Sequence, residues 1–144
     1  MEAQNYANHR RDVPAFHFIL LPIILLTLIG SFVNLYQSWG DHQRQYSASL
    51  IVVIMVCLAL VSLLARLFSL KAQDRAILAE ENLRHYVITG NLLDPKLTAR
   101  QIIGLRFASD EEFVDLARSA VEKNLSEDAI KKAVKNWKAD TYRV

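Results

Sequence analysis

Residues 16–36 read FHFILLPIILLTLIGSFVNLY, and residues 48–70 read ASLIVVIMVCLALVSLLARLFSL. The first run contains no Asp, Glu, Lys or Arg, and the second contains only Arg66. At a rise of about 1.5 Å per residue, about 20 helical residues match the ~30 Å hydrocarbon core of a bilayer. Two runs of this length in 144 residues predict transmembrane helices over about 14–37 and 48–70. The alternative is a pair of buried helices in a soluble protein.

The two runs predict an all-α protein built on a transmembrane hairpin. A polar segment, 1–12, precedes the hairpin (13–70), whose outer loop is expected over 38–47. The second helix should extend beyond the membrane over 71–90, and residues 91–144 should form a small helical bundle. The first run is too long for the apolar region of a cleaved signal peptide, which favours an uncleaved signal anchor.

Basic residues predict the orientation of the hairpin. Five of them flank the ends of the spans that lie away from the loop: Arg10, Arg11, Arg66, Lys71 and Arg75. The loop offers only Arg44, next to the acidic Asp41. Because basic residues concentrate on the cytoplasmic side, both termini and the bundle should be cytoplasmic. Tyr36, Trp39 and Tyr46 would then form an aromatic belt at the outer interface.

Small side chains recur at intervals of three and four residues from the second run into the polar sequence beyond it. We call these positions the small-residue seam: Ser62, Ala65, Ser69, Ala72, Ala76, Ala79 and Leu83. No Gly or Pro interrupts residues 47–89, so we expect one helix of about 40 residues. A heptad of small residues allows another helix to approach closely, which predicts an interaction seam. The alternative is that alanine is present only as a good helix former.

Residues 91–144 show three sets of helix signals. Gly90 should end the long helix, and capping-box patterns begin at Thr98 and Ser109. Ser126 should cap a third helix, with its apolar face formed by Ile130, Ala133, Val134 and Trp137. The lysines of this last helix, Lys131, Lys135 and Lys138, either lie on an anionic membrane surface or form a solvated face.

The spans contain few polar residues. Pro22 should bend the first helix, and Asp12 could cap its start. A haem bound by His17 would need a second histidine at matching depth, which the other span lacks, so His17 is expected at the membrane interface. Arg66 is close enough to the inner boundary for its side chain to reach the headgroups. Asn34, Trp39 and Tyr46 complete the predicted polar and anchoring positions.

Composition argues against several functions. The net charge of +2 comes from mixed signs, so no nucleic-acid partner is expected. The single cysteine, Cys57, excludes an intramolecular disulfide. No Gly-rich phosphate loop, metal-ligand cluster or nucleophile arrangement is present in the sequence. We therefore expect no enzymatic activity and no cofactor.

Two stretches carry a resemblance to a known family: QNYANHRRDVPAFHF (residues 4–18) and RQIIGLRFASDEEFVDLA (residues 100–117). Together with the hairpin they resemble a family of small bacterial membrane proteins whose function is not assigned. The resemblance implies a bacterial cytoplasmic membrane and two spans. It transfers no functional residue.

These features favour a non-catalytic accessory or scaffolding subunit of a bacterial inner-membrane complex. Its expected partners are the bilayer and other membrane subunits, or further copies of the chain. One alternative is a self-associating, channel-like oligomer, although neither span has a polar stripe along its whole length. A haem- or quinone-associated protein is another alternative, and it depends on His17 alone.

Overall fold

The structure is a computed structural model that describes residues 4–9 and 12–140. Arg10 and Arg11, which contribute to the predicted orientation, lie outside the described residues. The described part of the chain is all-helical, as predicted, with a single isolated β-bridge between Ala108 and Trp137. It divides into two compact units: a hairpin unit, 12–69, and a C-terminal unit in which residues 4–9 join residues 70–140.

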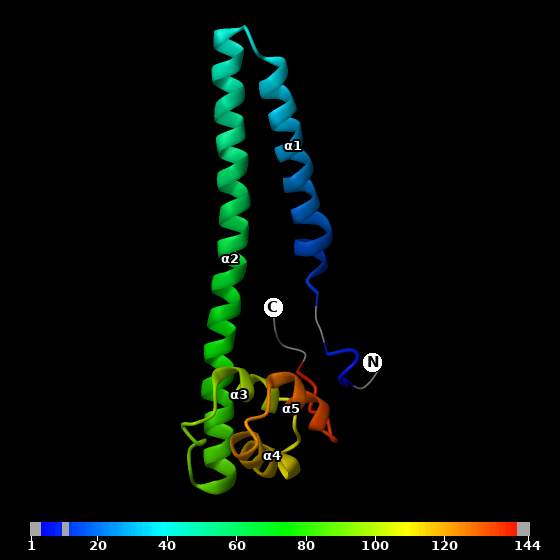
Figure 1. Cartoon of the computed structure of the whole chain (residues 1–144), viewed down its shortest axis with the longest axis vertical. Helices are drawn as coiled ribbons and strands as arrows, with labels where there is room; N and C mark the ends of the chain where they lie inside the picture. The colour runs from blue at the N-terminus through cyan, green and yellow to red at the C-terminus, as the bar shows by residue number, and fades with distance from the viewer. Residues whose placement is uncertain (1–3, 10–11, 141–144) are drawn as a thin grey trace. The chain divides into compact units, whose positions relative to one another are not determined.

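The hairpin unit consists of two helical arms joined by a short turn. A π-helix, η1 (Ala15–Leu20), continues directly into α1 (Leu21–Gln37), and α2 (His42–Thr89) returns beside α1 (Figure 1). The turn contains only residues 38–41, with Gly40 at a φ of 96°. Six of the ten residues predicted as the loop are therefore the first residues of α2. As predicted, α2 is one unbroken helix, of 48 residues, followed by Gly90 at a φ of 75°.

Each arm of the hairpin has one line of shielded residues. On the first arm the line is His17, Leu21, Ile24, Leu28, Ser31, Leu35 and Ser38. On α2 it is Gln45, Ala48, Val52, Met55, Ala59, Ser62 and Arg66. Both lines alternate steps of three and four residues, which is the spacing of antiparallel helices packed side chain into groove. Ser31 and Ser38 are buried along this line of contact.

The start of the first arm differs from the prediction. Asp12 does not cap it: Pro14 is the N-cap residue, and no side chain in the part of the chain that the structure describes accepts a cap hydrogen bond. The carbonyl oxygen of Val13 instead accepts from the amides of Phe16 and His17, both at 3.0 Å. Because the chain is already helical at Pro14, Asp12 lies too far back to reach these amides. Pro22 sits in the first turn of α1, where the π-helix ends.

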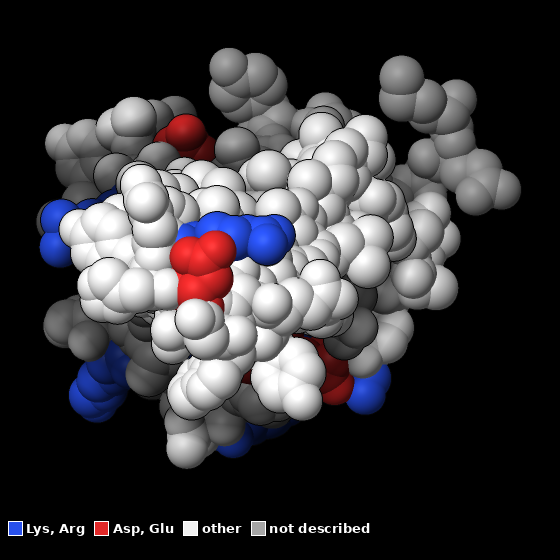
Figure 2. Space-filling view, turned by 90° about the horizontal axis from the view of Figure 1, so that it is seen from above, with Lys and Arg blue, Asp and Glu red and all other residues white. Residues whose placement is uncertain are grey.

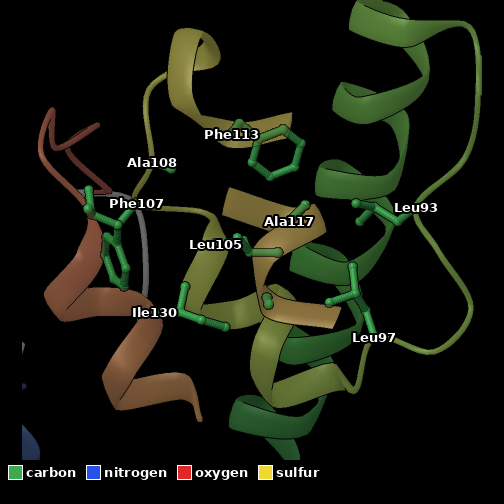
Figure 3. Close-up of a cluster of buried hydrophobic side chains, with 10 residues drawn as sticks. Leu93, Leu97, Leu105, Phe107, Ala108, Phe113, Ala117 and Ile130 are labelled. Carbon is green, nitrogen blue, oxygen red and sulfur yellow. The ribbon is translucent and has the colours of Figure 1, made fainter. Parts of the chain in front are cut away.

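Three short helices pack with the last part of α2 in the C-terminal unit: α3 (Ala99–Leu105), α4 (Asp110–Glu122) and α5 (Glu127–Ala133). Their buried side chains form one hydrophobic cluster (Figure 3). Its largest fully buried side chains are Phe107, Phe113, Leu105 and Ile130. Gly104 lets α3 approach α5, because a Cβ at this position would lie 3.1 Å from the Glu127 carbonyl oxygen.

Two of the three N-caps predicted for the C-terminal unit form. Thr98 makes a reciprocal capping box with Gln101, and Ser126 accepts from the amide of Ala129. The capping box at Ser109 was a wrong prediction: its hydroxyl oxygen is buried and has no hydrogen-bond partner among the described residues. Glu112, which is three residues beyond Ser109 and completes this capping-box pattern, instead accepts with its carboxylate from the amides of Lys135 and Asn136, at 3.1 and 3.0 Å.

The last helix is shorter than predicted. It ends at Ala133, and Val134 already has an extended backbone. Trp137 lies in the β-bridge with Ala108, so it does not share a helical face with Ile130. The predicted basic face is also wrong, because Lys135 and Lys138 lie beyond the helix. The bridge explains the early end: the amide of Lys138 donates to the Phe107 carbonyl oxygen at 2.8 Å.

Candidate functional site

In the C-terminal unit, the buried face of α2 carries Ile77, Glu81 and Arg84. Ala79 is two residues from Ile77 and two from Glu81. A step of two residues is a rotation of about 200° around a helix, so Ala79 lies on the opposite side. That opposite side is exposed. We call it the uncovered face of α2, and it consists of Ala72, Ala76, Ala79, Leu83, Tyr86 and Val87.

The uncovered face is apolar and includes large side chains. Leu83, Tyr86 and Val87 are 62%, 53% and 76% exposed. Single exposed hydrophobic residues are ordinary, but a contiguous row along one helix face is typical of an interaction surface. Because the bundle packs on the other side of α2, the described residues of the C-terminal unit leave this row uncovered.

A buried ionic network fixes the bundle to α2. The Arg84 guanidinium donates to Glu81 at 3.0 Å, to Asp110 at 2.6 Å and to the Ala108 carbonyl oxygen at 2.7 Å. It also lies over the Phe113 ring, 4.3 Å from the centroid. The Arg84 and Glu81 side chains are only 10% and 9% exposed. The network joins α2 to the α3–α4 connection and so determines which face of α2 remains free.

Sequence analysis did not identify Glu81 or Arg84. The available signal was their spacing of three residues, which places them on one helix face. That face is opposite to Ala79 and Leu83, so the pair could have indicated which side of α2 the bundle covers.

The small-residue seam does not form one contact surface within the chain. In the hairpin unit Ser62 belongs to the shielded line, whereas Ala65 and Ser69 are exposed. Ala65 and Ser69 therefore do not pack against the large side chains of the first arm, because the shielded line of α2 passes through Ser62 and Arg66. In the C-terminal unit, the remaining four members are all exposed: Ala72, Ala76, Ala79 and Leu83.

The polar residues of the hairpin have local partners. Nδ1 of His17 lies 3.1 Å from the Val13 carbonyl oxygen, and the His17 ring meets Phe16 edge to face. The Arg66 guanidinium lies over the same Phe16 ring, 5.8 Å from its centroid. Asn34 is exposed, and its backbone carbonyl accepts from the Ser38 hydroxyl at 2.8 Å. None of these contacts forms a ligand set.

The loop end of the hairpin is aromatic and nearly uncharged. Trp39 and Tyr46 are exposed there, as is Tyr36. Between residues 38 and 47 the only charged side chains are Asp41 and Arg44. Figure 2, which looks down on this end, shows a mainly uncharged surface with one basic and one acidic group side by side near its centre.

Residues 4–9 pack on the C-terminal unit, which the sequence did not predict. The Tyr6 hydroxyl donates to Asp128, and His9 lies among the rings of Tyr6, Phe107 and Trp137. Hydrogen bonds from Lys132 and Tyr6 hold the pKa of the Asp128 carboxyl below its usual value. The bond to Asp128 raises the pKa of Lys132.

An open pocket of about 690 Å³ lies beside the end of α2. Its apolar lining includes Leu93, Leu97 and Val114, and charged residues such as Lys96 and Glu122 are also present. His85 lines it as well, but its Nδ1 is 2.7 Å from the Asn91 carbonyl oxygen. Within the described residues, no group of three or more His, Cys, Asp or Glu side chains is placed to hold a metal ion.

These observations define a class: a small all-helical protein with two helices long and apolar enough to cross a membrane, and a compact helical C-terminal unit. Comparison with protein families gives the particular family. The whole chain, residues 1–144, belongs to the family of unknown function DUF6526. No curated protein and no solved structure matches the chain.

Proposed function

We propose that this protein is a non-catalytic accessory or scaffolding subunit of a complex in the bacterial inner membrane. The observation that carries the proposal is the uncovered face of α2. It is an apolar surface in the C-terminal unit, where the chain has already closed its own core. An accessory subunit needs such a contact surface, and it needs no catalytic group.

The exposure of the hairpin supports its insertion in a membrane. In the apolar 18-residue stretch of Ala15–Gln37 only 11% is buried within the chain. In the corresponding stretch of His42–Thr89 the buried share is 17%. The central helix of a soluble protein would be mostly buried, whereas these helices expose leucines, isoleucines and phenylalanines on most of their surface. Burying apolar surface contributes about 25 cal/mol per Å², so lipid is the favourable surrounding for both arms.

The proposed orientation places both termini in the cytoplasm and the loop outside. It rests on the basic residues at the inner ends of the spans, including Lys71 and Arg75, against the single Arg44 of the loop. Arg66 lies near the start of the first arm, over Phe16, which suits an arginine close to a membrane boundary.

Cysteine labelling of intact cells tests this orientation. A Cys57→Ser chain would carry a single new cysteine at Gln43, in the loop end, or at Lys132, in α5. A membrane-impermeant maleimide should modify the cysteine at position 43 and leave that at position 132 unmodified until the cells are opened. The opposite pattern would invert the topology.

Co-purification tests the accessory role. In a chain with Ala72→Leu and Ala76→Leu, the larger side chains should hold a partner helix away, at about 1–3 kcal/mol per site. The variant should insert normally but recover less of the proteins that co-purify with the natural chain. A matched control is Ala99→Leu with Ala133→Leu, two exposed alanines of the same unit that lie outside α2. Equal recovery from both variants would remove the main support for the proposal.

A further inference from the structure

The uncovered face of α2 has the spacing of a coiled-coil core. Ala72, Ala76, Ala79, Leu83 and Tyr86 follow one another at steps of four, three, four and three residues. This corresponds to d, a, d, a and d positions of a heptad repeat. All five are exposed and lie on α2 (His42–Thr89), which is unbroken here. The face is thus a continuous helical surface with the spacing that a second helix could pack against.

Two opposite charges flank this face. Arg75 occupies a g position, and Glu80 occupies the e position of the following heptad. Both are exposed, and no ion pair of either is found among the described residues. Residues five apart are turned by about 140° around one helix, so Arg75 and Glu80 of the same chain lie on different sides and do not pair.

In a parallel two-stranded coiled coil, a g residue faces the e residue of the next heptad on the partner helix. Arg75 would then meet Glu80 of a second copy, and Glu80 would meet Arg75 of that copy. Each helix supplies one residue to each of two equivalent ion pairs, so the surface is complementary to itself.

We propose that the occupant of the uncovered face is a second copy of this chain, packed parallel through residues 72–87 of α2. This inference rests on the proposed membrane orientation, because two copies inserted the same way hold their α2 helices parallel. Alanines at the positions nearest the membrane allow close backbone approach, and Leu83 and Tyr86 provide the larger apolar contacts. The scaffolding subunit would enter its complex as a dimer, and Ala72→Leu with Ala76→Leu would lower the recovery of other proteins by separating the two copies.

Disulfide trapping in isolated native membranes tests the geometry. Cys57→Ser removes the only natural cysteine, and Ala79→Cys places a thiol at a d position facing its own copy. Mild oxidation should link Ala79→Cys chains into dimers. Lys71→Cys, exposed on the same helix but off the uncovered face, is the matched control and should yield about tenfold less. Equal yields from the two positions would overturn the proposal.

Charge reversal tests whether the partner is a copy of the chain. Arg75→Glu or Glu80→Arg alone converts two attractive pairs into two like-charge pairs, which should lower the linked fraction of Ala79→Cys chains about tenfold. The double variant, or a mixture of the two single variants in one membrane, restores opposite charges at both contacts. Each should therefore restore the linked fraction seen for Ala79→Cys chains that keep Arg75 and Glu80. If neither recovers it, the flanking charges do not pair between copies and the proposal fails.

The two proposals fail separately. If Ala72→Leu with Ala76→Leu lowers co-purification while Ala79→Cys chains do not cross-link, the face binds another protein, and only the dimer is overturned. If the chains cross-link as expected but no other protein co-purifies, the dimer stands and the accessory role is overturned.

Discussion

The hairpin unit and the C-terminal unit contain similar helices but bury their apolar side chains differently. In the hairpin each arm shields a single line of residues and exposes the rest of its apolar surface. The C-terminal unit encloses whole aromatic rings and includes a buried arginine and glutamate. The first arrangement suits an apolar surrounding and the second suits water, because only water makes complete burial of apolar groups favourable. The uncovered face of α2 is the exception, since it belongs to the unit that is otherwise closed.

The largest expected effect distinguishes two phenylalanines. Phe113 is fully buried in the C-terminal unit, whereas Phe32 of α1 is 52% exposed. Phe113→Ala should lower the free energy of unfolding of the C-terminal unit by about 3–5 kcal/mol through the cavity it leaves. Phe32→Ala should leave that unit unchanged. Thermal unfolding of the full chain in detergent, followed by Trp137 fluorescence in a Trp39→Phe background, measures both. Similar losses would contradict the separation of the two units.

Removing Arg84 should have the next largest effect. Arg84→Ala leaves the Glu81 carboxylate buried without its partner, which should destabilise the C-terminal unit by about 3 kcal/mol. The control is Arg118→Ala, because Arg118 is exposed and its closest contact with Asp115 is 3.7 Å. That change should alter stability by less than about 0.5 kcal/mol. Thermal unfolding followed by Trp137 fluorescence measures both variants. If Arg84→Ala lowers the free energy of unfolding no more than Arg118→Ala does, the network does not hold the bundle on α2.

Substitution of Gly104 tests how closely α3 and α5 approach each other. Gly104→Leu places its side chain against Glu127 and Ile130 of α5 and should destabilise the unit by about 1–3 kcal/mol. In the hairpin, Gly30 has open space around it, since a Cβ there would meet nothing within 4 Å. Gly30→Leu should therefore leave both insertion and the unfolding of the C-terminal unit unchanged. An unaltered midpoint for Gly104→Leu would mean that α3 and α5 can separate freely.

The smallest expected effect concerns the N-terminal residues on the bundle. The Asp128 carboxylate is favoured by hydrogen bonds from Lys132 and Tyr6, so its pKa in the folded chain is lower than the usual 3.8. The contribution of this carboxylate to the stability of the folded unit is complete above the usual pKa and is lost as the pH falls through the lowered pKa. The NMR signal of the Tyr6 ring should therefore shift with a midpoint at a pH below 3.8.

Asp128→Asn provides the control for this titration. The amide keeps the shape of the carboxyl group but carries no charge, so the acidic shift of the Tyr6 signal should disappear. A shift that persists in this variant would have to come from another acidic group.

The main features of the fold follow from local sequence. Apolar length defines the two arms, and the absence of Gly and Pro from residues 47–89 makes α2 continuous. Thr98 and Ser126 cap their helices as expected, because such caps depend on neighbouring backbone amides alone. Three predictions were wrong: the caps at Asp12 and Ser109 and the last turns of α5. In each case a contact between distant residues, or a backbone that is already helical, determines the structure instead of the local sequence pattern.

The sequence by itself determined the helical class, the hairpin and the periodic small residues of α2. These properties depend on the order of residues along one helix, which a linear pattern records. Only the tertiary structure decided which face of α2 the bundle covers. The Arg84 network joins residues 24 to 26 positions apart, and Gly104 determines how closely α3 meets α5. Contacts of this kind depend on the chain folding back on itself, and no local pattern specifies them.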